Sequence, residues 1–375
     1  MPSPFDATGM VMQEAEPLKP YTTFKIGGPA RYFANAASVE EFREISIFAT
    51  KIELPLFVLG GGSNILVSDH GYDGVVMHPA HSGIEIAHED AETVTLEVNA
   101  AETWDDLVQY AMERGWWGIE NLSHIPGQAG AALVQNIGAY GQQVSDVVRQ
   151  ARVLDIATGT PRVLGAAECG FGYRHSVFNS TERGKLIIVE LTLHLAKQGN
   201  PQLDYPDVRA YFQERGIQHP SIAEIRQAIV AIRDSKFPFP REERGGNAGS
   251  FFKNLNLVES EYASLREMLW RNFPSQVVTR LEEIRNRFPS AGQIKIPTAF
   301  LISICDLKGY RIGGAQVNEI QPLVLLNQGG ATSQDVMALA QHVRKTVRER
   351  TGMKISIEPE LVGFTTQELA EMDEQ

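Results

Sequence analysis

The chain has 375 residues, 43% of them hydrophobic, and a formal net charge of −12 at pH 7. This length exceeds one ordinary hydrophobic core, so we expect two or three domains. The acidic charge argues against nucleic acid as a partner, because it repels phosphate backbones, although a local cluster of Lys, Arg and amides can still bind a small anion. Cys169 and Cys305 lie far apart and form no disulfide framework, which indicates a reducing compartment.

Residues 1–20 are polar and interrupted by proline, and we expect them to be a loose lead-in. They contain neither a basic n-region nor an apolar h-region, so no signal peptide is predicted. No apolar run has the length of a bilayer span. We therefore expect a cytoplasmic protein without membrane insertion.

The first half of the chain is rich in strand patterns. Ser38 and Glu41 form a capping box that begins a short helix, and a second helix is predicted from Thr103 to Gly115. Apolar runs predict strands at 54–60, 65–69, 93–98 and 185–196 and a hairpin at 151–164.

The second half is more helical. After a loop-rich stretch at 197–220, Ser221 and Glu224 form another capping box, followed by a helix with one apolar face: Ile222, Ile225, Ile229 and Ile232. Pro238 and Pro240 predict a domain boundary near 240. Helical patterns follow at 258–271, 276–287, 297–308 and 332–350, and a closing strand at 354–364. The predicted fold class is α+β.

The stretch "VLGGGSNILVSD" places three glycines, Gly60, Gly61 and Gly62, after an apolar strand. Without Cβ atoms, their amides can converge on an anion. A Rossmann site needs a helix next, whereas Ile65 begins a strand pattern, so that site is not predicted. A tight hairpin turn explains the glycines equally well, but Ser63 and Asn64 favour a pyrophosphate site.

The segment 124–147, "HIPGQAGAALVQNIGAYGQQVSDV", is unusually rich in small residues. Small side chains allow a flat ligand to lie against the backbone, and close packing between elements is the alternative. Together with the glycine loop, the segment suggests a large, flat, phosphorylated cofactor. Tyr140 is either a wall of that site or part of the core.

In "FGYRHSVF", 171–178, strand alternation would place Arg174 on the face of Gly172 and Ser176, opposite Phe171, Tyr173 and His175. An arginine surrounded by small residues has room to clamp a carboxylate. An arginine stacked on neighbouring rings at the surface is an equally common arrangement.

Two further stretches carry groups that can move protons. In "ISIEPELV", Glu358 and Glu360 would share one face of an edge strand, where one carboxyl stays protonated if it is partly buried; two solvated glutamates are the alternative. In "GNAGSFFKN", Ser250 lies between glycines and two phenylalanines, either as a turn entering a strand or as a proton donor. His78 and His81 lack a third ligand, so no metal is predicted.

In this order, "YTTFKIGGPARYF", "LGGGSNILVSD", "IPGQAGAALVQNIGAYG", "FGYRHSVF", "GNAGSFFKN", "LKGYRIGGAQVN" and "IEPE" resemble the UDP-N-acetylenolpyruvoylglucosamine reductase family over residues 21–364. The resemblance implies an FAD-binding domain of the p-cresol methylhydroxylase/vanillyl-alcohol oxidase type followed by a substrate-binding domain. After the lead-in, the implied divisions are 21–198 for FAD (subdomains about 21–83 and 84–198), 199–240 for an insertion and connecting helix, 241–350 for substrate and 351–375 for a closing strand and tail. "LDYPD" matches the longer type of the family.

The resemblance also implies an activity. NADPH reduces a non-covalently bound FAD, which then reduces the enolpyruvyl group of a UDP-sugar to give UDP-N-acetylmuramate for peptidoglycan. Ser250 would donate the proton, assisted by Arg174 and a protonated Glu360. Substrate contacts are implied for Tyr205, Lys236, Asn254 and Gln321. Cofactor contacts are implied for Gly60, Gly61, Gly62, Ser63, Asn64, Ile65, Ile125, Pro126, Gly127, Ala129, Asn136, Gly138, Ala139 and Tyr140.

Two positions depart from the family pattern: Leu255 stands where proline is usual, and His175 where an acidic residue is often found. Two other functions remain open. A flavin oxidase would share the glycine loops without needing Ser250, Glu360 and Lys236. A non-catalytic nucleotide-sugar sensor would not need Ser250, Arg174 and Glu360 together. No feature of the sequence implies an oligomer.

Overall fold

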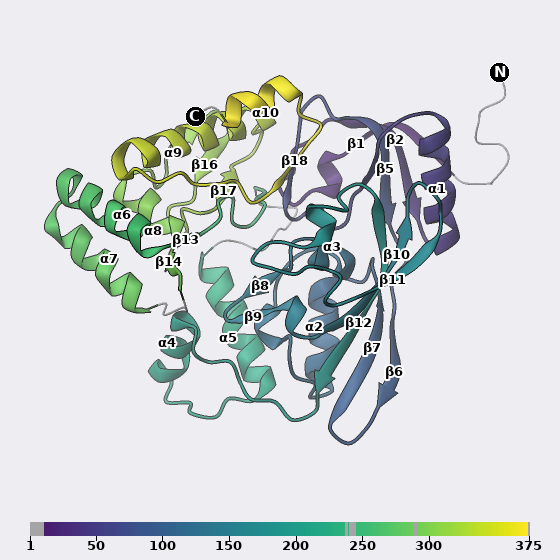
Figure 1. Ribbon diagram of the computed structural model, residues 1–375, viewed down its shortest axis with the longest axis horizontal. Coiled ribbons are helices and arrows are strands. Elements are labelled where there is room, and N and C mark those ends of the chain that lie inside the picture. Colours follow the sequence, from purple (N-terminus) through teal and green to yellow (C-terminus); the bar gives the residue numbers. More distant parts are fainter. Residues whose placement is uncertain (1–10, 237–238, 240–244, 288–291, 374–375) are drawn as a thin grey trace. The chain divides into compact units, whose positions relative to one another are not determined.

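The computed structural model describes residues 11–236, 239, 245–287 and 292–373. The chain divides into two compact units between which it alternates (Figure 1). The first unit consists of the residues up to 16, 30–61 and 72–235, and the second of 17–29, 62–71 and the residues from 236 onward. The proline break predicted at 238 and 240 lies outside the described residues. The domain boundaries expected from the sequence stay predictions.

The first unit contains a four-stranded sheet in the order β1-β2-β5-β3, with parallel pairing of β5 to both β2 and β3. Its strands are β1 (Gln13–Pro17), β2 (Pro29–Ala36), β3 (Leu56–Val58) and β5 (Tyr72–Pro79). Helix α1 (Val39–Lys51) begins as predicted, because the Ser38 hydroxyl accepts a hydrogen bond from the Glu41 amide at 3.2 Å. The loose lead-in predicted for 1–20 is wrong where β1 forms and where the 3-10 helix Lys19–Tyr21 begins.

A five-stranded antiparallel sheet, in the order β11-β10-β12-β7-β6, forms the rest of this unit's framework. Its strands are β6 (Ile84–Glu89), β7 (Thr93–Asn99), β10 (Val148–Asp155), β11 (Pro161–Gly165) and β12 (Leu186–Ala196). The predicted hairpin and long strand are confirmed. Strand β12 serves two cores, since Ile187 and Val189 pack with the α1 cluster, and Leu191 and Leu193 with that of α2.

The helices of this unit are α2 (Trp104–Glu113), α3 (Ala129–Val134), α4 (Pro206–Glu214) and α5 (Ile222–Lys236). Helices α2 and α5 confirm the sequence, and the four isoleucines of α5 are buried. The loop-rich prediction for 197–220 is wrong at α4, where Pro206 occupies the first turn without losing a hydrogen bond. Two short strands, β8 (Gly138–Ala139) and β9 (Gln142–Gln143), follow α3.

The second unit is built of helices and short strands. Helices α6 (Glu259–Asn272), α7 (Ser275–Arg287) and α9 (Ser333–Thr351) confirm the predicted patterns, and Gly352 ends α9 with φ +75°. Helix α8 (Thr298–Ile304) is shorter than predicted. The small strands are β4 (Ile65–Val67), β13 (Leu255–Leu257), β14 (Ile294–Ile296), β15 (Arg311–Ile312), β16 (Ala315–Val317), β17 (Leu325–Asn327) and β18 (Glu360–Val362).

The predicted closing strand at 354–364 is wrong in extent. Only β18 is strand, Pro359 has no amide to donate to a ladder, and helix α10 (Thr366–Asp373) follows where the sequence analysis expected a tail. Strand β18 pairs in parallel with β4, with Glu360 opposite Ile65. Because β3 pairs with β5 instead, the glycines between β3 and β4 are not a hairpin turn.

One hydrophobic core joins the separate segments of the second unit. Phe251 and Phe252 are both 0% exposed, and they pack in the same cluster as Phe24 and Leu66. The phenylalanines that follow Ser250 therefore hold its segment in the core.

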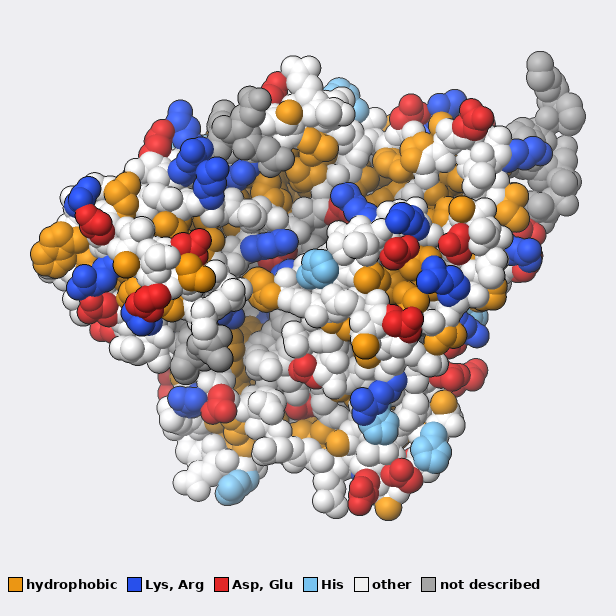
Figure 2. Space-filling model, viewed as in Figure 1, with side chains coloured by type: hydrophobic (Ala, Val, Ile, Leu, Met, Phe, Trp, Pro, Cys, Tyr) orange, Lys and Arg blue, Asp and Glu red, His pale blue; other side chains and the backbone are white. Residues whose placement is uncertain are grey.

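On the face drawn in Figure 2, basic and acidic side chains are interspersed among hydrophobic ones. Within the described ranges, every helix is too short or too polar to cross a membrane.

Candidate active site

The glycine loop offers a row of backbone donors. The amides of Gly60 to Asn64 make no hydrogen bond of normal geometry to any part of the chain that the structure describes. Successive amides without protein acceptors are the arrangement that binds phosphate oxygens, so the residues fit a pyrophosphate. A Cβ on Gly62 would lie 2.0 Å from the Tyr21 carbonyl oxygen, and φ is +58°, so only glycine is tolerated there.

Two of these glycines also serve close packing. A Cβ on Gly61 would lie 2.6 Å from the Gly127 Cα, and one on Gly60 would lie 3.0 Å from the Ala131 Cβ. In α3, a Cβ on Gly130 would meet the Ala100 Cβ at 2.7 Å. The packing alternative for the small residues is thus confirmed at these positions. The cofactor contacts predicted for the loop and for 125–140 stay predictions.

The prediction of a strand at 171–178 is wrong. Gly172 and His175 exchange backbone hydrogen bonds across a tight turn, and Arg174 lies in that turn with φ +52°. Arg174 Nη2 donates to the Gly138 carbonyl at 3.1 Å, and its guanidinium lies 5.7 Å from the centre of the Tyr173 ring. The turn therefore attaches this arginine to the start of β8.

Asn136 supports the same region. Its Nδ2 donates to the Gly172 carbonyl at 3.0 Å, and its Oδ1 accepts from the Ser145 amide at 3.0 Å. The side chain is 2% exposed and its φ is +47°. Asn136 thus fixes the turn that carries Arg174, a role that the sequence analysis did not separate from cofactor contact.

The structure brings Tyr140 and Tyr205 together. Their ring centres lie 5.2 Å apart in an edge-to-face arrangement, and Tyr140 is 8% exposed in the cluster formed by α4 and α5. Burial raises the pKa of the Tyr140 hydroxyl, against the opposing charge of Arg233. Tyr140 is thus part of this core, and a cofactor-facing role for it stays a prediction.

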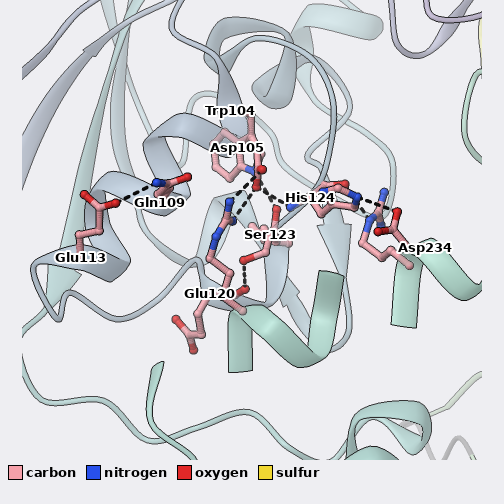
Figure 3. Close-up of polar contacts among 11 residues, drawn as sticks. Trp104, Asp105, Gln109, Glu113, Glu120, Ser123, His124 and Asp234 are labelled. Atoms are coloured by element: carbon pink, nitrogen blue, oxygen red, sulfur yellow. Dashed lines mark hydrogen bonds and ion pairs between the residues drawn. The ribbon is translucent and has the colours of Figure 1, made fainter. Parts of the chain in front are cut away.

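An ion-pair network, partly drawn in Figure 3, ties helix α5 to the segment before Ile125. Asp105 accepts from both terminal nitrogens of Arg226, at 2.6 and 2.9 Å, and His124 Nε2 lies 3.0 Å from Asp234 Oδ1. Arg233 Nε donates to the His124 carbonyl at 2.8 Å. Burial alone would raise the pKa of Asp105, but the hydrogen bonds from Arg226 and the His124 amide outweigh it and lower that pKa.

The sequence analysis missed this network, because its partners lie 121 residues apart for Asp105 and Arg226. The one signal in the sequence is that α5 carries arginines and an aspartate beside its apolar face. The network fixes the helix that ends at Lys236.

In the second unit, Ser250 follows Gly249, whose φ of +67° turns the chain. Ser250 is half-buried, and its hydroxyl makes no hydrogen bond to any described residue, so it stays available to a substrate. The next amide, that of Phe251, donates to the Leu323 carbonyl at 2.7 Å.

Three segments of the second unit meet around Ser250 and Glu360. The Glu360 amide donates to the Asn64 carbonyl at 3.0 Å, and the Glu358 amide donates to the Phe251 carbonyl at 2.9 Å. Asn64 Nδ2 also reaches the Glu358 carbonyl at 3.4 Å. The glycine-loop residues 62–65, the Ser250 segment and the Glu360 strand are therefore neighbours.

The remaining predicted substrate residues have structural contacts. Asn254 Oδ1 accepts from the Thr298 amide at 3.1 Å and so caps α8, Gln321 lies in a turn closed by the Val324 amide at 2.9 Å, and the Lys236 carbonyl accepts from Asn318 at 3.1 Å. Leu255 begins β13 and pairs with Ile296, so its backbone is used in a strand where the family has proline. Substrate contact stays a prediction for all three polar residues.

Comparison with known proteins supports two domains. Residues 30–165 match the family model of an FAD binding domain, and residues 240–362 match that of the UDP-N-acetylenolpyruvoylglucosamine reductase C-terminal domain. The α+β fold class with these two domains is confirmed, and so is FAD as cofactor.

Whole-length relatives agree. The chain is 40% identical to UDP-N-acetylenolpyruvoylglucosamine reductase of Pseudomonas aeruginosa, over 93% of this chain and 98% of the relative, and 36% identical to that of Burkholderia ambifaria, over 96% and 99%. The crystal structure of the Thermus caldophilus reductase (MurB) covers 94% of this chain and 98% of its own, at 25% identity and a TM-score of 0.61. The chain therefore belongs to the UDP-N-acetylenolpyruvoylglucosamine reductase family of oxidoreductases.

Proposed function

We propose that this protein reduces the enolpyruvyl group of UDP-N-acetyl-3-O-(1-carboxyvinyl)-glucosamine to the lactyl ether. The product is UDP-N-acetylmuramate, a precursor of peptidoglycan, and the reductant is NADPH. The observation that carries the proposal is the meeting of three segments in the second unit: the 62–65 loop, the Ser250 segment and the Glu360 strand.

Bound FAD supplies a hydride, taken from NADPH, to the terminal carbon of the enolpyruvyl group. The π bond of the carbon–carbon double bond would break, and its electron pair would move to the adjacent carbon and into the carboxylate. Arg174 as a cation and Glu360 as a hydrogen-bonding acid would stabilise this charge, since fixed donors act strongly in a dry site. Ser250 Oγ would give its proton to the adjacent carbon. A serine hydroxyl is a weak acid, but this carbon is strongly basic.

The chain's own groups suit binding of both ligands. The unused amides of 60–64 would hold the FAD pyrophosphate. Tyr205, Lys236, Asn254 and Gln321 would contact the UDP-sugar. We assign 21–198 to FAD binding and 241–350 to substrate binding, linked by the insertion and helix of 199–240.

We further propose that the enzyme acts in the cytoplasm. Both cysteines are free and buried, and burial raises the pKa of each thiol to about 11, which keeps them unreactive in a reducing compartment.

The test is an absorbance experiment on the purified protein. We expect a flavin spectrum that NADPH bleaches and that the enolpyruvyl UDP-sugar restores without oxygen. Restoration by oxygen alone would instead support an oxidase. A flavin that NADPH never bleaches would support a non-catalytic sensor. Denaturation should release the yellow colour, because no tether to the flavin is predicted.

A further inference from the structure

The turn at Thr22–Lys25, part of the block "YTTFKIGG" that the proposed chemistry does not use, contacts both the glycine loop and the segment that leads to Ser250. The Thr23 amide donates to the Gly62 carbonyl at 3.0 Å. The Thr23 hydroxyl donates to the Asn247 carbonyl at 2.7 Å, with Gly62 O more distant at 3.4 Å. One residue thus contacts both loops, and all three segments belong to the second unit.

The attachment to Asn247 is double. The Asn247 amide donates back to the Thr23 carbonyl at 3.1 Å, so the two residues are joined in both directions. A Cβ on the preceding Gly246 would lie 2.2 Å from the Phe24 carbonyl oxygen, so the two chains approach as closely as glycine permits. Asn247 is 2% exposed and cannot shift without disturbing this contact.

From Asn247 the connection continues to Ser250. Asn247 Oδ1 accepts from the Gly249 amide at 2.9 Å, which closes a turn over the left-handed Gly249. Two residues after Gly249 the chain enters the core at Phe251, whose ring lies edge-on to that of Phe24, with 6.2 Å between the ring centres. Ser250 therefore lies between a turn held by hydrogen bonds and a buried ring. Thr23 holds that turn on one side, and on the other the Asn327 amide donates to the Gly246 carbonyl at 2.8 Å.

We propose that Thr23 is a positioning residue for Ser250: its hydroxyl sets the distance between the Ser250 turn and the glycine loop at Gly62. The inference rests on the proposed function, in which Ser250 supplies the proton. A displacement of about 1 Å at a reacting group costs up to 100-fold in rate. The hydroxyl should therefore matter to proton delivery, and little to flavin binding, because Gly62 is held by the Thr23 backbone.

The chain offers a matched control. Thr22 is 5% exposed, and its hydroxyl also donates to a backbone carbonyl, that of Ile26 at 3.1 Å. That bond stays inside the turn and reaches neither loop. Thr22→Val and Thr23→Val remove the same group from neighbouring positions, and Thr23→Ser restores the hydroxyl.

The test is stopped-flow absorbance of the flavin in each variant with FAD bound. For Thr23→Val we expect reoxidation by the UDP-sugar to slow by about 10-fold or more. Reduction by NADPH and the FAD dissociation constant should each change by no more than about threefold, which is less than a typical hydrogen bond contributes. Thr23→Ser should regain most of the reoxidation rate. Thr22→Val should stay near wild type in both half-reactions.

Equal effects of Thr22→Val and Thr23→Val, or equal slowing of both half-reactions by Thr23→Val, would overturn the assignment. If Thr23→Val does not hold FAD, Thr23→Ala repeats the test with less bulk, and loss of FAD there too would make the residue structural only. A wild-type enzyme that the UDP-sugar never reoxidises would refute the proposed function itself. In that case, the FAD dissociation constants of wild type and Thr23→Val would still show whether Thr23 affects flavin binding.

Discussion

The Arg174 turn of the first unit and the Ser250 turn of the second each hold a predicted site residue, but they use left-handed backbone differently. Around Arg174, three residues of the predicted site are themselves left-handed: Asn136, Tyr140 and Arg174 have φ of +47°, +49° and +52°. At Ser250, the left-handed residue is the neighbouring Gly249. Each left-handed non-glycine residue costs about 1–2 kcal/mol.

The difference indicates where each turn draws its rigidity. The Arg174 turn is held by its own surroundings, since the Asn179 and Asn136 side chains donate to the carbonyls of Arg174 and Gly172. Gly249 tolerates many conformations, so the Ser250 turn depends on contacts with distant segments: Asn247 bonds to Thr23, and the Phe251 amide donates to the Leu323 carbonyl at 2.7 Å. The first turn should resist remote changes better than the second.

The largest expected effect tests the second turn directly. Ser250→Ala should slow flavin reoxidation by the UDP-sugar by about 10²- to 10⁴-fold, because a positioned proton donor is lost. Flavin reduction by NADPH should stay nearly unchanged. Stopped-flow absorbance separates the two steps, with Ser264→Ala, at an exposed position of α6, as control. Equal slowing of both steps would remove Ser250 from its role.

In the first turn, Arg174→Lys keeps the charge but loses the planar fork, and Nη2 can no longer bind Gly138 as it does now. We expect the same reoxidation step to slow by about 10²-fold, as for one lost donor to a developing anion. Single-turnover rates measure this. A rate within twofold of wild type would show that position 174 needs only a positive charge.

Asp105→Asn tests the framework of the first unit. It leaves Arg226 charged without its carboxylate partner, and we expect unfolding by urea to become easier by about 3 kcal/mol. The exposed neighbour Asp106→Asn is the matched control and should have little effect.

This effect should depend on pH in one direction. The Asp105 pKa is lowered from its ordinary 3.8, so its stabilisation is fully present above about pH 4 and is lost as the pH falls through the lowered value. The gap between wild type and Asp105→Asn should therefore narrow only in acid. A gap that stays constant down to pH 2 would contradict the ion pair as its cause.

Lys236→Ala should raise the KM for the UDP-sugar by about 10-fold, the worth of one hydrogen bond from a charged group. NADPH-driven reduction of a dye acceptor should not change. The exposed Lys345→Ala on α9 serves as control. An unchanged KM would exclude Lys236 from substrate binding.

The smallest effect concerns the glycine that the Ser250 turn relies on. A Cβ at Gly249 meets nothing within 4 Å, so Gly249→Ala carries only the backbone cost of about 1–2 kcal/mol. Gly115→Ala, with φ +72° and equally open space, should cost the same stability. Reoxidation should slow several-fold for Gly249→Ala alone. An unchanged reoxidation rate in Gly249→Ala, with both variants losing the same stability, would show that the strain at Gly249 does not displace Ser250.

Local patterns predicted the fold well. The capping boxes at Ser38 and Ser221 and the apolar face of α5 all correspond to helices, because each signal lies within one turn. Long apolar runs likewise identified β12. The strand prediction failed at 171–178, where Gly172 and His175 pair across a tight turn, and in the extent of β18, which pairs with the distant β4.

The candidate site was predictable only through its motifs. Resemblance to a family pointed to Ser250, Arg174 and Glu360, but nothing near Ser250 in sequence indicates Thr23, 224 residues from Asn247. The sequence around the glycines could not separate close packing from anion binding. Gly61 packs against Gly127 and also belongs to the row of amides without protein acceptors. Such contacts become visible only in three dimensions.

The pairing of β18 with β4 has a consequence for biosynthesis. Asn64 meets Glu358 across 294 residues of chain, so the second unit cannot close until the ribosome has made almost the whole polypeptide. Contacts between residues so far apart in sequence form slowly. Until they form, the earlier segments of the second unit expose apolar surface to other chains. Chains cut short before β18 should be substrates for chaperones and proteases.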